Sequence, residues 1–172
     1  TRLANSALDG VVGQQAAVAS SIVQYAAGDL VCYRADFPEP LRQRQSDAWD
    51  PVLGWFRDTH GVSFRVTTGI VAVEQPAAAI DAVAAVVAAL EPFALAAIHE
   101  LTTLSGSVLI ALAVLAGWLD EAAAWKVAHV DEDWQISQWG EDSEAVLRRR
   151  ARWRDFAAAV ALLKAIAPNS RA

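Results

Sequence analysis

The chain has 172 residues, which is long enough for one domain with a hydrophobic core. Its apolar fraction of 55% is rich in alanine, a strong helix former that buries little surface, so seven tryptophans and five phenylalanines must supply much of the core. The net charge of −6 argues against a nucleic-acid-binding protein, which needs a basic face. The only cysteine, Cys32, excludes an intrachain disulfide, and we expect it to be a buried structural thiol.

The first third of the sequence predicts two helices around one strand. Apolar residues at helical spacing predict a helix over Ala7–Tyr25, and the apolar run Asp29–Arg34 predicts a buried strand. A second helix is predicted over Leu41–Thr59, where Pro51 should kink or interrupt it. No signal peptide is recognisable, and the first residues resemble the middle of a domain.

The middle of the sequence predicts a second strand and a third helix. Val62–Val73 is rich in β-branched residues and predicts a strand with a break near Gly69. The two predicted strands either pair with each other or join a sheet elsewhere. Pro76 then begins a helix that is expected to end near Leu90.

Leu101–Leu119 is an uncharged segment of 19 residues, which is the length of a transmembrane helix. Acidic residues flank it in place of Lys or Arg, and hydroxyl side chains cluster in its first half. This pattern favours a buried central helix, part of a helical stretch from Phe93 to Trp118 with a break around Ser105–Ser107. A membrane-associated helical protein remains the alternative.

The last third predicts a helix over Glu121–Val130, capped by Asp120, and a long final helix that begins at Trp134 or Ser143 and ends near Ile166. An arginine run near residues 148–154 lies beside acidic residues, which favours i,i+4 ion pairs on a solvated helix face over a phosphate site. The predicted fold class is mainly α, or α+β with a minor short-strand element. It is a single helical domain over residues 1–172, with about six helices around an apolar central helix.

The chemistry-bearing residues do not form a recognisable catalytic or cofactor motif. The three histidines are far apart, and the sequence has no nucleophile elbow and no glycine-rich phosphate loop. We therefore predict no catalytic residue, no metal and no cofactor, and a protein that is not an enzyme. The acidic residues between Asp131 and Glu144 leave a small acid–base hydrolase as an alternative.

Residues 131–144, here named the acidic Trp-Gly region, combine carboxylates with two tryptophans. In one interpretation the acids flank helix N-termini, where the helix dipole favours them, and the tryptophans pack inward. In the other, exposed tryptophans beside carboxylates form a partner-binding patch. The candidate partner-binding residues are Glu132, Asp133, Trp134, Trp139, Gly140, Glu141 and Glu144.

Several short sequence segments, distributed over nearly the whole chain, resemble one known family in their order and spacing. They are Asp29–Ala35, Trp49–Pro51, Gly61–Ile70, Leu101–Ser107 and the acidic Trp-Gly region. Together they resemble the Atp12 family of F1-ATP synthase assembly chaperones, in its helical C-terminal domain. The alanine-rich composition suggests a bacterial member.

The resemblance implies a chaperone that binds the unassembled F1 ATP synthase α subunit and prevents its aggregation before the α3β3 hexamer forms. We further expect a monomer without cofactor, located in the cytoplasm if the protein is bacterial; the eukaryotic relatives are located in the mitochondrial matrix. The family's functionally important acid matches Glu144, with Glu141 as the neighbouring alternative. The family's N-terminal β-rich domain has no counterpart in this sequence, so we expect the chain to be the helical part of the protein.

Overall fold

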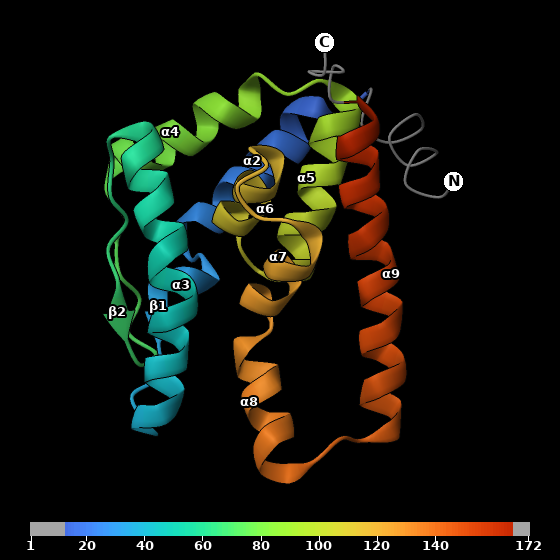
Figure 1. Cartoon of the computed structure of the whole chain (residues 1–172). Coiled ribbons are helices and arrows are strands. Elements are labelled where there is room, and N and C mark those ends of the chain that lie inside the picture. Colours follow the sequence, from blue (N-terminus) through green and yellow to red (C-terminus); the bar gives the residue numbers. More distant parts are fainter. Residues whose placement is uncertain (1–12, 167–172) are drawn as a thin grey trace.

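The computed structural model describes residues 13–166, which form a helical assembly with one pair of short strands at its side (Figure 1). This confirms the predicted fold class, although the described residues contain eight α-helices where about six were expected. The expected break around Ser105–Ser107 divides the apolar segment into two helices, and the C-terminal third contains one helix more than predicted. The helices are α2 (Gln15–Ala27), α3 (Glu39–His60), α4 (Ala77–Ala88), α5 (Pro92–Ser105), α6 (Val108–Leu115), α7 (Glu121–Ala128), α8 (Val130–Trp139) and α9 (Ser143–Ile166).

The apolar segment forms the buried centre of the molecule, as predicted, and the break falls where it was expected. Gly106 adopts φ 72°, a left-handed conformation that ends α5. Ser107 then caps α6 by accepting a hydrogen bond of 3.1 Å from the Ile110 amide. Every residue from Val108 to Val114 is buried, and α5 packs against α2, α6 and α9. Among residues 13–166 there is no helix with both the length and the apolar character needed to cross a membrane.

Helix α3 differs from its prediction because it continues through Pro51 without interruption. Of the two predicted effects of Pro51, a kink or an interruption, the interruption was wrong. Trp49, Val52 and Phe56 are all buried, so the helix is anchored to the core on both sides of the proline. We attribute the continuity to this burial, which offsets the one hydrogen bond that proline cannot donate.

The predicted strands are much shorter in the structure. Within Asp29–Arg34, a 3₁₀ turn (Leu30–Cys32) precedes strand β1 (Tyr33–Arg34), and within Val62–Val73 only β2 (Thr67–Thr68) is a strand. The Asp29 carboxylate accepts a hydrogen bond of 3.1 Å from the Val31 amide, which favours a turn over an extended chain.

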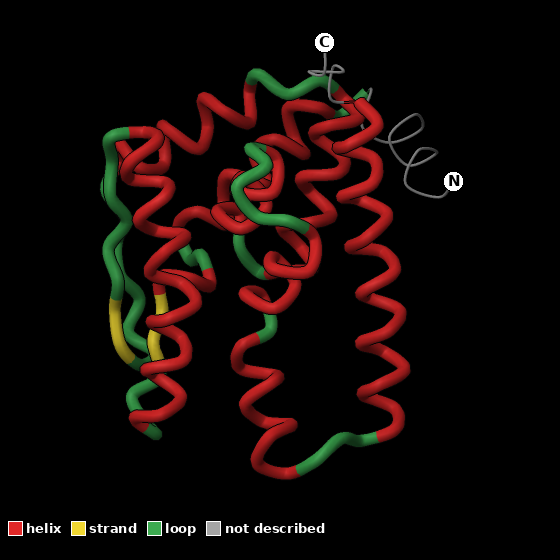
Figure 2. The backbone as a smooth tube through the Cα atoms, in the orientation of Figure 1, coloured by secondary structure: helices red, strands yellow, loops and turns green. Residues whose placement is uncertain are grey.

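The two strands pair with each other, which was one of the two predicted arrangements. They run parallel, with Tyr33 opposite Thr67, and lie beside α3 (Figure 2). Gly69 follows β2 with φ 78°, and a Cβ atom at this position would lie 2.5 Å from an Asp36 carboxylate oxygen. The predicted break near Gly69 is therefore confirmed at a position that only glycine fills without strain.

The remaining helices largely agree with those predicted from the sequence. Helix α7 is capped by Asp120 as predicted, and Trp134 belongs to the separate helix α8, so the final helix begins at Ser143. Cys32 is buried, as expected. The first part of the helix predicted over Ala7–Tyr25 lies outside the described residues.

Candidate functional site

The acidic Trp-Gly region occupies the end of the molecule where α8 leads away from the helical centre and α9 returns to it (Figure 1). Residues 140–142 join the two helices. A groove of about 590 Å³ opens between them. Its walls are formed by Trp125, Glu132, Gln135, Ile136, Trp139, Gly140, Glu141, Asp142, Ala145, Val146, Arg149, Arg150 and Trp153.

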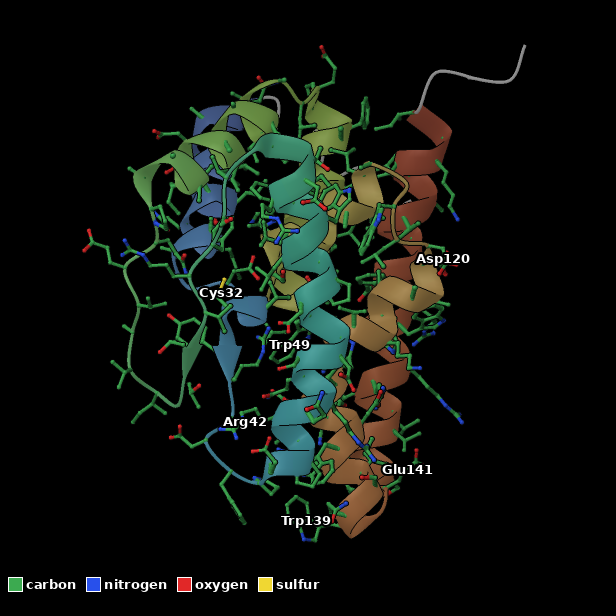
Figure 3. The ribbon with its side chains drawn as sticks, turned by 60° about the vertical axis from the view of Figure 1, so that its left-hand side comes forward. Cys32, Arg42, Trp49, Asp120, Trp139 and Glu141 are labelled. Atoms are coloured by element: carbon green, nitrogen blue, oxygen red, sulfur yellow. The ribbon has the colours of Figure 1, made fainter. Side chains whose placement is uncertain are left out.

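Aromatic side chains fix the inner end of the groove. Trp125 packs edge to face against Trp153 and Phe156, with ring centroids 5.2 and 5.4 Å apart respectively. Phe156 is fully buried and joins this cluster to the core. The outer end is different, because Trp139 is 79% exposed and lies at the tip of the molecule near Glu141 (Figure 3).

His129 lies between α7 and α8 and connects them to α9. Its Nε2 lies 2.7 Å from an Arg152 guanidinium nitrogen, which can only donate, so Nε2 accepts and Nδ1 carries the proton. Nδ1 then donates to the Trp125 carbonyl oxygen over 2.7 Å. Burial lowers the pKa of His129, and the arginine contact acts in the same direction. A neutral histidine therefore links the inner end of α8 to α9.

Helix α3 holds the opposite face of α8. Gln45 accepts a hydrogen bond from the Ala35 amide and donates one to the Asp131 carboxylate, each 2.7 Å long. The Arg44 guanidinium lies 4.8 Å from the centre of the Trp134 ring, in a cation–π contact. Trp134 is thus held against α3 and does not face the groove.

Three acids of the region form ion pairs with three different arginines. Asp133 pairs with Arg149, Glu132 lies 3.5 Å from Arg152, and Glu144 lies 3.1 Å from Arg148. The predicted i,i+4 ion pair is confirmed for Glu144, whereas the other two pairs link α8 to α9. This arrangement suits ion pairs that position helices and gives no support to the acid–base hydrolase. Within residues 13–166, no group of three or more His, Cys, Asp or Glu residues is placed to hold a metal ion.

The structure divides the predicted partner-binding residues into two sets. Four of them line the groove: Glu132, Trp139, Gly140 and Glu141. The other three lie beside it, with Asp133 in its ion pair, Trp134 against α3 and Glu144 exposed on the first turn of α9.

Sequence reasoning missed most of the α9 wall and the inner aromatic end of the groove. The missed residues are Trp125, Ile136, Val146, Arg149, Arg150 and Trp153. Along α8, Ile136 lies four residues after Glu132 and three before Trp139, and along α9 the spacing from Val146 to Arg149 or Arg150 and on to Trp153 is three or four residues. This helical spacing is the signal that would have placed them on facing sides of the two helices.

A second hollow of about 590 Å³ lies on the other side of α8, between that helix, β1 and the start of α3. Phe37 and Ile70 line it and are 85% and 102% exposed. Trp139 contributes to both hollows. This end of the molecule therefore presents large apolar side chains to solvent, which is unusual on a surface without a partner.

Comparison with known proteins identifies the family. The model of the ATP12 chaperone protein family matches residues 1–57. Atp12 from Paracoccus denitrificans has 36% sequence identity and a TM-score of 0.91, over 95% of this chain and 70% of that chain. The chain belongs to the Atp12 chaperone family.

Two further solved structures are similar to this Atp12-family chain. The Atu1473 protein of Agrobacterium tumefaciens, proposed to be a chaperone, has 44% identity and a TM-score of 0.91 over 95% of this chain. A mutant of Paracoccus denitrificans Atp12p has 36% identity and a TM-score of 0.92 over the same share. The chain spans 61% of the length of the Agrobacterium protein and 70% of the Paracoccus protein.

Proposed function

We propose that this Atp12-family chain is an assembly chaperone that binds the unassembled α subunit of the F1 ATP synthase in the cytoplasm and does not act as an enzyme. Family membership supports the chaperone role. The single observation that carries the binding role is the open groove between α8 and α9, with Trp139 exposed at its outer end.

The chemistry of the groove suits a client that must be both held and released. An unassembled subunit exposes the apolar surface that later becomes its interface with other subunits, and this surface tends to aggregate. The groove offers tryptophan and aliphatic contacts with a charged rim. A moderate interface with a polar component covers such a surface while remaining reversible.

Retention of purified F1 α subunit on the immobilised chain tests the proposal. We expect free α subunit to be retained and assembled F1 to pass through, because assembly covers the subunit interfaces. Light scattering of the α subunit at its aggregation temperature should fall when the chain is added. Equal retention of free and assembled subunit, or unchanged scattering, would contradict the proposal.

A further inference from the structure

The dimensions of the groove between α8 and α9 define what fits into it. Its walls extend from Glu132 to Trp139 on α8 and from Ala145 to Trp153 on α9. At a rise of 1.5 Å per residue these walls are about 10–12 Å long, or about two helical turns. The volume of about 590 Å³ is far larger than one side chain, and it suits a row of side chains from one face of a helix.

The walls also favour one backbone conformation in the occupant. Both are α-helices, whose backbone amides and carbonyls are used within each helix. An extended peptide laid between them would find few backbone partners and would leave its own polar groups unsatisfied. A helical segment satisfies its own backbone and presents side chains at positions i, i+4 and i+7 to apolar contacts such as Ile136, Val146 and Trp153.

Charge differs between the two ends of the groove. The outer end has three carboxylates and one arginine: Glu141, Asp142 and Glu144, with Arg148 paired to the last two. Glu141 has no ion pair with any residue from 13 to 166. Towards the inner end, Arg149 and Arg152 are paired with acids of α8, whereas Arg150 has no such partner among the same residues. The outer end is therefore acidic and the inner end basic.

We infer that the groove binds an amphipathic α-helix that carries a basic residue opposite Glu141 and, about two turns away, an acidic residue opposite Arg150, with apolar side chains between them. In the protein the helix comes from the client subunit, and this part of the inference rests on the proposed function. The two charge pairs, one at Glu141 and one at Arg150, fix the position of the bound helix along the groove. They also disfavour a helix that carries the same charge at both ends.

Three stapled helical peptides test the inference directly on the intact chain. All three have the same face of leucines and differ only in the charged residue at each end of that face. The Lys/Glu peptide has one lysine and one glutamate, the Lys/Lys peptide has two lysines, and the Glu/Glu peptide has two glutamates. Stapling is needed because a helix of this length is marginal in water. We expect the Lys/Glu peptide to bind about fivefold more tightly than either other peptide at low salt, and this preference to shrink in 1 M salt. Isothermal titration calorimetry measures the affinities.

Two single variants of the protein test the charge pairs, and their expected results are the same for either direction of the bound peptide along the groove. Arg150→Glu makes both ends acidic and should favour the Lys/Lys peptide. Glu141→Arg leaves the outer end without net charge, so the Lys/Glu peptide should lose its advantage over the Glu/Glu peptide. Both side chains are exposed, so the melting temperature should not change. An unchanged order of preference in both variants would overturn the inference. So would equal binding of a proline-interrupted peptide with the same composition.

A competition experiment separates this inference from the proposed function. Saturating Lys/Glu peptide should displace the F1 α subunit from the immobilised chain. If the α subunit is retained but not displaced, the proposed function stands and the inference about the helix fails. If the α subunit is not retained while the peptide preferences follow the charges, the proposed function fails and the groove remains a helix-binding site.

Discussion

The α5–α6 centre and the α8–α9 end use apolar residues in opposite ways. Residues Val108–Val114 of α6 are all buried, and its N-terminus is tied to the rest of the chain through Asp29 and Ser107. At the other end, α8 has no buried residue, and polar and cation–π contacts of half-buried side chains connect it to α3 and α9. The first arrangement secures the fold, and the second leaves tryptophan surface available to a partner.

The comparison predicts that substitutions in the two regions change different measured quantities. Substitutions in the centre should lower the free energy of unfolding, whereas substitutions at the α8–α9 end should lower affinity for the client at nearly constant stability.

Leu109→Ala removes a fully buried side chain from α6. We expect a loss of about 3 kcal/mol in the free energy of unfolding, because the variant loses apolar burial and leaves a cavity. Denaturant unfolding measures the loss. The matched control is Leu147→Ala on α9, where the leucine is 65% exposed and the change should stay within about 0.5 kcal/mol. Similar losses in both variants would refute the contrast between the regions.

Asp29→Asn tests the buried connection to α6. The Asp29 carboxylate accepts amide hydrogen bonds of 3.1 Å from both Val31 and Leu109. Burial raises the pKa of Asp29 to about 6 from its ordinary value of 3.8, although the hydrogen bonds to the carboxylate act in the opposite direction.

The sign of the pH effect follows from this raised pKa. The folded state binds the proton more tightly than the unfolded state, so wild-type stability should gain up to about 3 kcal/mol from this group as the pH falls from about 7 to 4. An asparagine side chain does not titrate and cannot gain this stability. The free energy of unfolding of wild type minus that of Asp29→Asn should therefore become more positive over the same range. Denaturant unfolding at a series of pH values measures the difference. His129 contributes equally to the pH dependence of both proteins, so its contribution cancels in the difference. If the difference in the free energy of unfolding is constant between about pH 7 and 4, Asp29 does not titrate in this range.

Trp139→Ala removes the exposed tryptophan that lines both hollows at the α8–α9 end. Affinity for the client should fall about tenfold or more, because tryptophans commonly dominate interfaces, while the free energy of unfolding changes by less than about 0.5 kcal/mol. Trp118→Ala is the matched control, since Trp118 is 43% exposed and lies outside the groove. Equal losses of affinity in the two variants would place the binding surface elsewhere.

Glu144→Lys reverses the exposed charge on the first turn of α9. Capture of the client should weaken several-fold, with helical content and melting temperature nearly unchanged, because the ion pair with Arg148 is exposed and worth about 0.5 kcal/mol at most. Asp155→Lys on the same helix is the control and should leave capture unchanged. If Glu144→Lys unfolds the protein, Glu144 has a structural role and the binding prediction loses that residue.

Local signals in the sequence predicted much of the fold. The glycine and serine at positions 106 and 107 located the break between α5 and α6, and Asp120 located the start of α7. The predictions that were wrong involved contacts that the sequence pattern did not reveal, and most of these contacts join distant residues. The continuity of α3 through Pro51 follows core burial on both sides, and the turn at Leu30–Cys32 follows the contacts of Asp29 with Val31 and Leu109.

From the amino-acid sequence we could predict a mainly helical protein with a buried central segment, and a candidate partner-binding region between residues 131 and 144. Helical periodicity, capping residues and turn-forming glycines act over a few residues, so they can be read directly. The sequence did not predict that Trp139 and Glu141 line a groove while Trp134 packs against α3. Which face of α8 meets α3 and which meets α9 depends on contacts such as Gln45 with Asp131 and Arg149 with Asp133. Such contacts join residues that are distant in the sequence, so no local pattern encodes them.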